Sequence, residues 1–156
     1  MMKNMIWVAL LTLSVLSPTL ANAAPNPRYV INGGEVYDKD NNLTWQRCSV
    51  GQEWKEGTGC AGTVKTFTFQ DAPRQANGNW RVPTREELAT LIDQQRQNFP
   101  TIDMDAFPDM NEDFPTYWTS TPSDADRSWD VRFTDGNVTD DVSVRRYAVR
   151  LVRSGK

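Results

Sequence analysis

The residues best able to do chemistry are the carboxylates that crowd the second half of the chain. Between residues 101 and 141 the sequence holds eleven acids and two arginines, which leaves a net charge of −9. Seven of these acids fall in two stretches that we expect to be loops: Asp103, Asp105, Asp109, Glu112, Asp113, Asp124 and Asp126. A large field of one sign attracts oppositely charged partners and repels polyanions. The stretch therefore favours a basic partner and disfavours nucleic acid.

Carboxylates also serve catalysis and metal binding. A nucleophile activated by His is excluded because the chain has no His, and no motif singles out two acids as a glycosidase pair. The stretch Asp38–Asn42 opens like a calcium-binding EF-hand loop, but Leu43 and Ser49 occupy the positions of the required Gly and Glu. A weak calcium site among the five acids between residues 103 and 113 stays open as an alternative. Otherwise the sequence predicts a non-catalytic protein without a metal or another cofactor.

The first 23 residues are typical of a secretory signal peptide. Lys3 supplies a positive end, Met5–Leu16 is an apolar run, and Ala21–Ala23 offers small residues for cleavage. The run is too short to cross a bilayer, so no membrane span is expected. The mature chain would be residues 24–156, a single domain, and we expect it in the periplasm, with secretion or the cell surface as the alternatives.

Cys48 and Cys60 are the two cysteines of the chain, and both follow the signal segment. In an oxidising compartment such a pair forms a disulfide more often than a metal site, and no His is present to complete a zinc set. The loop that they close contains Trp54, which we expect to be an exposed aromatic contact, together with Tyr117. The other tryptophans beside expected strands should belong to the core: Trp45, Trp80, Trp118 and Trp129.

The elements that must position these residues are organised around residues 80–88. Pro83 keeps Val82 extended, and Thr84 with Glu87 three residues later has the form of a helix-capping box. Apolar residues recur at helical spacing after Leu88, which predicts a helix from Thr84 to about Gln97.

A shorter first helix is expected after Thr68, bent or cut short by Pro73. Strand patterns precede and follow the two helices, and the proline-rich stretch 99–115 reads as a long loop. The expected strands are 28–31, 35–37, 43–46, 63–67, 117–121, 129–133, 137–139 and 147–152. The fold class predicted is therefore α+β.

Several of these segments together resemble a known family, the bacterial exported domains called DUF1566 or the Lcl C-terminal domain. The matching stretches are Leu43–Cys48, Trp80–Thr84 with Glu87–Leu88, Ile102–Asp103 with Ala106–Pro108, Tyr117–Ser120 and Tyr147–Arg153. The resemblance implies a C-type lectin-like domain, in which two helices flank antiparallel sheets, the chain ends pair, and a long loop region after the second helix contacts ligand. One member is an adhesin that binds sulfated polysaccharide, which the acidic loops of this chain would repel.

These observations lead to two expectations about function. The first is an exported recognition protein whose acidic loop face binds a basic protein, for example a periplasmic inhibitor or immunity protein of an enzyme that acts on the cell envelope. Its contacts would come from the seven loop acids together with Trp54 and Tyr117. The alternative is a lectin-like module that binds a cell-envelope glycan. Salt separates them, because an acidic protein-binding face weakens as ionic strength rises, whereas a neutral-glycan site hardly responds.

Overall fold

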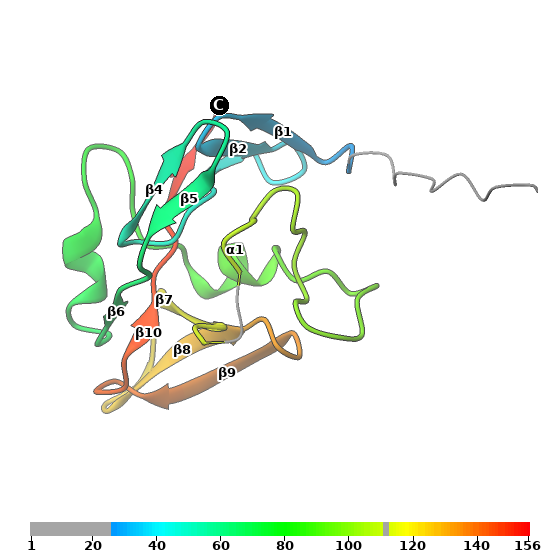
Figure 1. Cartoon of the computed structure of the whole chain (residues 1–156). Coiled ribbons are helices and arrows are strands. Elements are labelled where there is room, and N and C mark those ends of the chain that lie inside the picture. Colours follow the sequence, from blue (N-terminus) through cyan, green and yellow to red (C-terminus); the bar gives the residue numbers. More distant parts are fainter. Residues whose placement is uncertain (1–25, 111–112) are drawn as a thin grey trace, which may run out of the picture.

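The computed structural model describes residues 26–110 and 113–156, and within them the fold is nearly all β (Figure 1). The predicted signal peptide, residues 1–23, and the predicted contact residue Glu112 lie outside the described residues. No helix in the part described is long and apolar enough to cross a membrane.

The first sheet joins the two ends of the described chain. Its strands are β1 (Tyr29–Asn32), β2 (Glu35–Asp38), β3 (Leu43–Gln46) and β11 (Val152–Ser154), in the order β1-β2-β3-β11. All three pairings are antiparallel, so the C-terminal strand pairs with β3. Gly33, with a φ of 54°, lies in the two-residue turn between β1 and β2, where a left-handed residue favours glycine.

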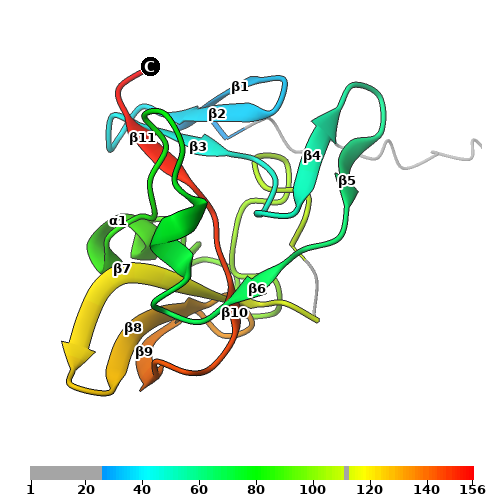
Figure 2. The same cartoon turned by 90° about the vertical axis from the view of Figure 1, so that its left-hand side faces the viewer.

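The second sheet has the order β6-β10-β7-β8-β9. Its strands are β6 (Thr66–Phe67), β7 (Thr116–Asp124), β8 (Arg127–Arg132), β9 (Asn137–Val142) and β10 (Tyr147–Ala148). Tyr117 and Trp118 of β7 are both buried, because they point to opposite faces and each face carries its own apolar cluster. The chain from β10 to β11 runs from this sheet to the first (Figure 2).

The disulfide loop forms a third, two-stranded sheet of β4 (Gln52–Lys55) and β5 (Gly59–Gly62). The predicted disulfide between Cys48 and Cys60 is confirmed, and it anchors β5 to the segment that leaves β3. We expected a loop here. The register pairs Trp54 with Cys60, which places the tryptophan on a regular hairpin instead.

The predicted α+β, C-type lectin-like class with two flanking helices is wrong. The helix α1 spans only Arg85–Ala89, and the expected first helix is the 3-10 turn η1 (Ala72–Gln75), with Pro73 in its first turn. The capping box is present, with Thr84 and Glu87 exchanging side chain–backbone hydrogen bonds.

The helix ends early because its next residues bond elsewhere. Thr90 donates its hydroxyl to the carbonyl of Glu87, and the N–H of Asp93 bonds to the carbonyl of Thr101 in the following loop. Leu88 and Leu91 are nevertheless buried, because tight turns continue the inward-facing pattern. The apolar spacing thus marked the core residues correctly but not the length of the helix.

Candidate functional site

A buried ion pair lies at the centre of the molecule. The guanidinium of Arg150, which follows β10, contacts Asp109 at 2.5 Å, and both side chains have no exposed area. Burial lowers the pKa of Arg150, but Asp109 and Tyr117 together raise it above its ordinary value. We expected Asp109 in the binding face, but its carboxylate is part of the framework.

Two hydroxyls extend this centre to β7. Ser49 donates both its N–H and its hydroxyl to Asp109, and its hydroxyl lies 2.7 Å from that of Tyr117. Burial raises the pKa of Tyr117, which is 1% exposed. Tyr117 therefore holds the framework together and is not available at the surface as an aromatic anchor. We call Ser49, Asp109, Tyr117 and Arg150 the buried charge centre.

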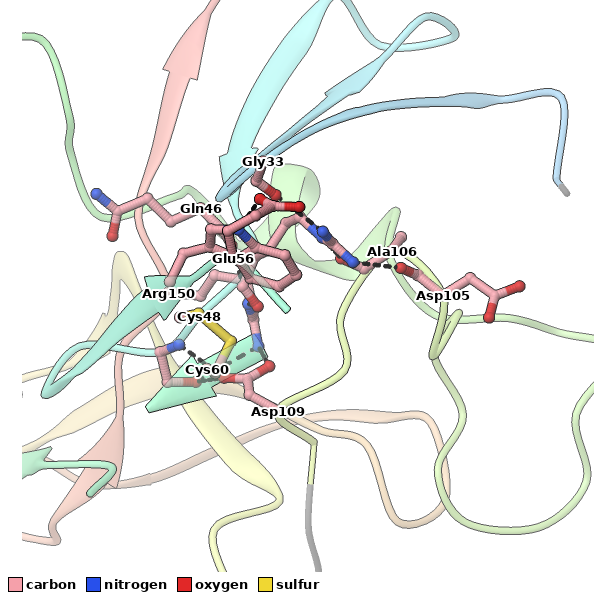
Figure 3. Close-up of a disulfide and its surroundings, with 12 residues drawn as sticks. Gly33, Gln46, Cys48, Glu56, Cys60, Asp105, Ala106, Asp109 and Arg150 are labelled. Atoms are coloured by element: carbon pink, nitrogen blue, oxygen red, sulfur yellow. Dashed lines mark hydrogen bonds and ion pairs between the residues drawn. A yellow bond between two sulfur atoms is a disulfide. The ribbon is translucent and has the colours of Figure 1, made fainter. Parts of the chain in front are cut away.

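The carbonyl of Arg47 accepts a hydrogen bond of 2.6 Å from Arg150, which Figure 3 shows beside Asp109. The guanidinium of Arg47 donates to the carbonyls of Gly33, Asp105 and Ala106, at distances between 2.8 and 3.1 Å. The same guanidinium stacks on the ring of Trp54, with 4.0 Å between its carbon and the ring centroid. Arg47 thus fixes three parts relative to one another: the β1–β2 turn, the β4–β5 hairpin and the loop of residues 103–109, which we call the acidic loop.

A groove of about 480 Å³ opens between the β4–β5 hairpin and the first sheet. Two tryptophans and a set of amide and carboxylate side chains line it: Asn32, Glu35, Gln46, Gln52, Glu53, Trp54 and Trp80. Gly34 and Cys48 complete the lining. We call this the tryptophan groove.

Both tryptophans of the groove are braced by arginines. Arg153 lies 5.2 Å from the ring centroid of Trp80 and donates to Glu35 at 2.8 Å. Trp54 is held by Arg47 and by a hydrogen bond of 3.3 Å from its indole N–H to Glu56. Braced side chains lose less rotamer freedom when a ligand binds, so the groove is pre-organised.

Two further features shape the groove for a ligand. Oε1 of Gln52 is buried and has no hydrogen-bond partner within the residues that the structure describes. A buried acceptor without a partner costs free energy in the folded protein. Gly34 gives Trp54 its place, since a Cβ at Gly34 would lie 2.8 Å from the Cβ of Trp54.

The predicted contact acids that are exposed or half-buried lie at three separate places. Asp103 and Asp105 lie beside β1, where they line a small cleft with Tyr29 and Ile31. Asp103 is half-buried and accepts the N–H groups of Asp105 and Ala106, whereas Asp105 is exposed.

Asp124 and Asp126 are exposed at the tip of the β7–β8 hairpin, in the second sheet. Asp113, also exposed, lies at a third place, in a small pocket beside Thr66 and Arg146. The acids that are adjacent in sequence therefore do not form one continuous face. Within residues 26–110 and 113–156, no group of three or more Asp, Glu, Cys or His side chains is arranged to hold a metal ion.

One buried acid escaped notice in the sequence. Asp130 of β8 is 3% exposed, accepts the hydroxyl of Thr139 at 3.2 Å, and leaves Oδ2 without a partner among the described residues. Burial raises its pKa to about 6. Trp80 also escaped notice, because its position beside an expected strand predicted a core residue and not a groove wall.

The family comparison agrees with the resemblance in the sequence. The model of the Lcl C-terminal domain matches residues 34–153, most of the chain. A comparison with curated proteins found no match. The match includes the buried charge centre, Arg47 and nearly all of the tryptophan groove. This chain belongs to the Lcl C-terminal domain family.

Proposed function

We propose that this protein is an exported, non-catalytic recognition protein whose tryptophan groove binds a neutral saccharide of the cell envelope. The groove supports this proposal because it combines aromatic rings with amide and carboxylate groups along one open channel. Sugars present apolar C–H faces that stack on such rings, and hydroxyls that need both donors and acceptors. The disulfide agrees with a protein that works in an oxidising compartment.

The charges around the groove favour a neutral ligand over an anionic one. Glu35 and Glu53 line it, while Arg47 and Arg153 beside it are held by carbonyl groups, aromatic rings and Glu35. A sulfated polysaccharide would be repelled by these carboxylates, and the two arginines already have other partners. Binding of a neutral saccharide should change less than twofold between 50 and 500 mM salt, because little charge is screened.

The first test is saccharide binding by Trp80→Ala, measured by calorimetry and tryptophan fluorescence with chitotetraose and maltohexaose as probes. We expect at least a tenfold loss of affinity, about 1.4 kcal/mol, because one ring face is removed. Trp129→Ala is the matched control. Trp129 is also half-buried, but it lies on the second sheet, where its ring stacks with Arg85 of α1. Equal binding by the two variants, or no binding of neutral saccharide by the unaltered protein, would refute the proposal.

A basic protein partner is a second proposal, for example an envelope-active enzyme that this protein would inhibit as an immunity protein. The observation that favours it is local: the exposed Asp105 and the half-buried Asp103 lie beside the exposed aliphatic side chain of Ile31. An apolar contact rimmed by charges of one sign is a common form of protein interface. A pull-down from envelope extract tests it, with Asp105→Asn as bait and Asp124→Asn as the control of equal charge. A basic protein that both baits retain equally would place its contacts away from Asp105.

A further inference from the structure

Strand β1 is an edge of the first sheet and carries little protection. It pairs with β2 alone, and Val30 and Ile31 are 39% and 45% exposed. Within the described chain, Val144 is the one further large apolar side chain that is exposed. The sequence of β1 contains no charge and no proline. An edge of this composition accepts another strand readily.

The other edges of the two larger sheets are protected. β11 exchanges two backbone hydrogen bonds of 2.9 Å with Arg81, and β9 carries Asp140 and Asp141. β6 is two residues long, and the side chain of Arg146 donates a hydrogen bond to the carbonyl of Thr66 in this strand. Short edges, charged edges and covered edges all resist pairing. β1 is only four residues long, and the N–H of Tyr29 is bonded to the carbonyl of Asn26, but the strand otherwise lacks these devices.

The register shows which backbone groups of β1 point outward. Asn32 and Glu35 close the two-residue turn, so they form a hydrogen-bonded pair. Because pairs alternate along an antiparallel ladder, Val30 also directs its N–H and C=O to β2. Ile31 lies between them and directs its N–H and C=O away from the sheet.

The acidic loop lies beside this outward edge. Tyr29 and Ile31 line a cleft of about 30 Å³ with Asp103 and Asp105, and Arg47 holds the loop in place through its carbonyls. The nearby guanidinium of Arg28 is already bonded to Asp38 and to the carbonyl of Thr90. The environment of the edge is therefore apolar with an acidic border.

We infer that β1 binds an extended basic segment of a partner protein by strand addition. Apolar side chains of the segment pack on Val30 on one face of the strand, and its backbone bonds to Ile31. Its Lys or Arg side chains lie on the opposite face, beside Ile31, where they reach Asp103 and Asp105. A second copy of this chain is disfavoured, because it would bring two acidic loops to one interface. This inference rests on the second proposal, the basic partner, and is independent of the saccharide groove.

The test compares Ile31→Pro with Ile31→Thr, using the peptides KVKVKVK and EVEVEVE as probes in calorimetry. Both variants lose the aliphatic side chain, but only proline removes the outward N–H, and proline is tolerated where the N–H of an edge strand faces solvent. We expect the basic peptide to bind and the acidic one not to bind. The proline variant should bind the basic peptide at least tenfold more weakly than the threonine variant does.

A measurement on the unaltered protein covers the case in which the proline variant does not fold. The amide of Ile31 should become protected from hydrogen exchange when KVKVKVK binds. Asp105→Asn should weaken that peptide more than Asp124→Asn does.

Three results would overturn strand addition. Equal binding by the proline and threonine variants, without protection of the Ile31 amide, leaves a basic partner but removes this mode of binding. Failure of the basic peptide to bind the unaltered protein removes both. A concentration-dependent dimer in sedimentation that Ile31→Pro abolishes identifies a second copy as the occupant.

Discussion

Asp109 and Asp105 lie four residues apart in one acidic loop, yet they belong to different parts of the molecule. Asp109 is buried, bonded to Arg150 and to Ser49, and has no exposed side-chain area. Asp105 is exposed, and its contact with Arg47 is made by its carbonyl and not by its carboxylate (Figure 3). One acid thus holds the framework together, while the other contributes charge to the surface.

The difference shows that burial and pairing, and not the position in a run of acids, decide what a carboxylate does. Asp109 is neutralised by an arginine 41 residues away in sequence. Four carboxylates form a series in this protein: Asp109 is buried and paired, Asp130 is buried with one oxygen unpartnered, Glu87 is half-buried and capping, and Asp124 is exposed. Substitution of each should have an effect that follows this order.

The largest effect is expected for Asp109→Asn. The change leaves the guanidinium of Arg150 buried without its compensating charge, which should lower the free energy of unfolding by about 3–5 kcal/mol. Urea denaturation at pH 7 measures it. Asp105→Asn, in the same loop, should stay within about 0.5 kcal/mol. Similar losses for the two variants would remove the distinction between framework and surface acids.

Asp130→Asn should stabilise the protein at neutral pH. The pKa of Asp130 is raised to about 6 in the fold, above its ordinary value of 3.8, so the folded state binds the proton more tightly than the unfolded state does. Its contribution to stability is therefore greatest below about pH 4, falls as pH rises through 6, and then stays low. The variant should gain on the order of 2 kcal/mol at pH 7.5 and little at pH 3.5. Unfolding across this pH range checks it, and an equal gain at both pH values would contradict it.

A smaller loss is expected for Glu87→Ala, which removes the capping box and the pair of hydrogen bonds from Arg81. The loss should be about 1 kcal/mol. The hydrogen bonds from Arg81 hold the pKa of Glu87 below its ordinary value, so its contribution is present above about pH 4.5 and is lost as pH falls through the lower folded pKa. Urea denaturation at pH 7 and at pH 3 compares the loss where Glu87 is charged with the loss at a lower pH. A loss that does not shrink at low pH would show that the charge of Glu87 contributes nothing.

The smallest effect is expected for the double change Asp124→Asn and Asp126→Asn. Both side chains are exposed at a hairpin tip, so the free energy of unfolding should change by less than about 0.5 kcal/mol. Thermal unfolding at pH 7 measures it. A larger change would mean that the charges at the tip contribute to the free energy of unfolding, as the charge of Asp109 does.

Local signals in the sequence predicted local structure well. The capping box at Thr84 and the Cys48–Cys60 disulfide are both confirmed, because each depends on a short stretch of chain. The pairing of Arg150 with Asp109, 41 residues away, is by contrast a long-range contact. Which acid pairs with Arg150 depends on how β10 and the acidic loop pack together, and the sequence of neither segment specifies that packing.

The candidate site and the length of the helix were harder to predict than the capping box and the disulfide. Trp54 belongs to the groove, but Trp80 joins it from a distant stretch, and the groove exists only where β4 meets the first sheet. The helix after Thr84 was overestimated because helical spacing does not report the competing bonds of Thr90 and Asp93. A contact between remote segments decided the first outcome, and hydrogen bonds over a few residues decided the second.

The most direct test of the saccharide groove is an NMR titration of ¹⁵N-labelled residues 24–156 with chitotetraose and maltohexaose. The indole N–H signals of Trp54 and Trp80 should shift together with the side-chain amide of Gln52, while that of Trp129 stays in place. Shifts centred on β1 and residues 103–105, or no shifts at millimolar saccharide, would contradict the assignment of the tryptophan groove as the recognition site.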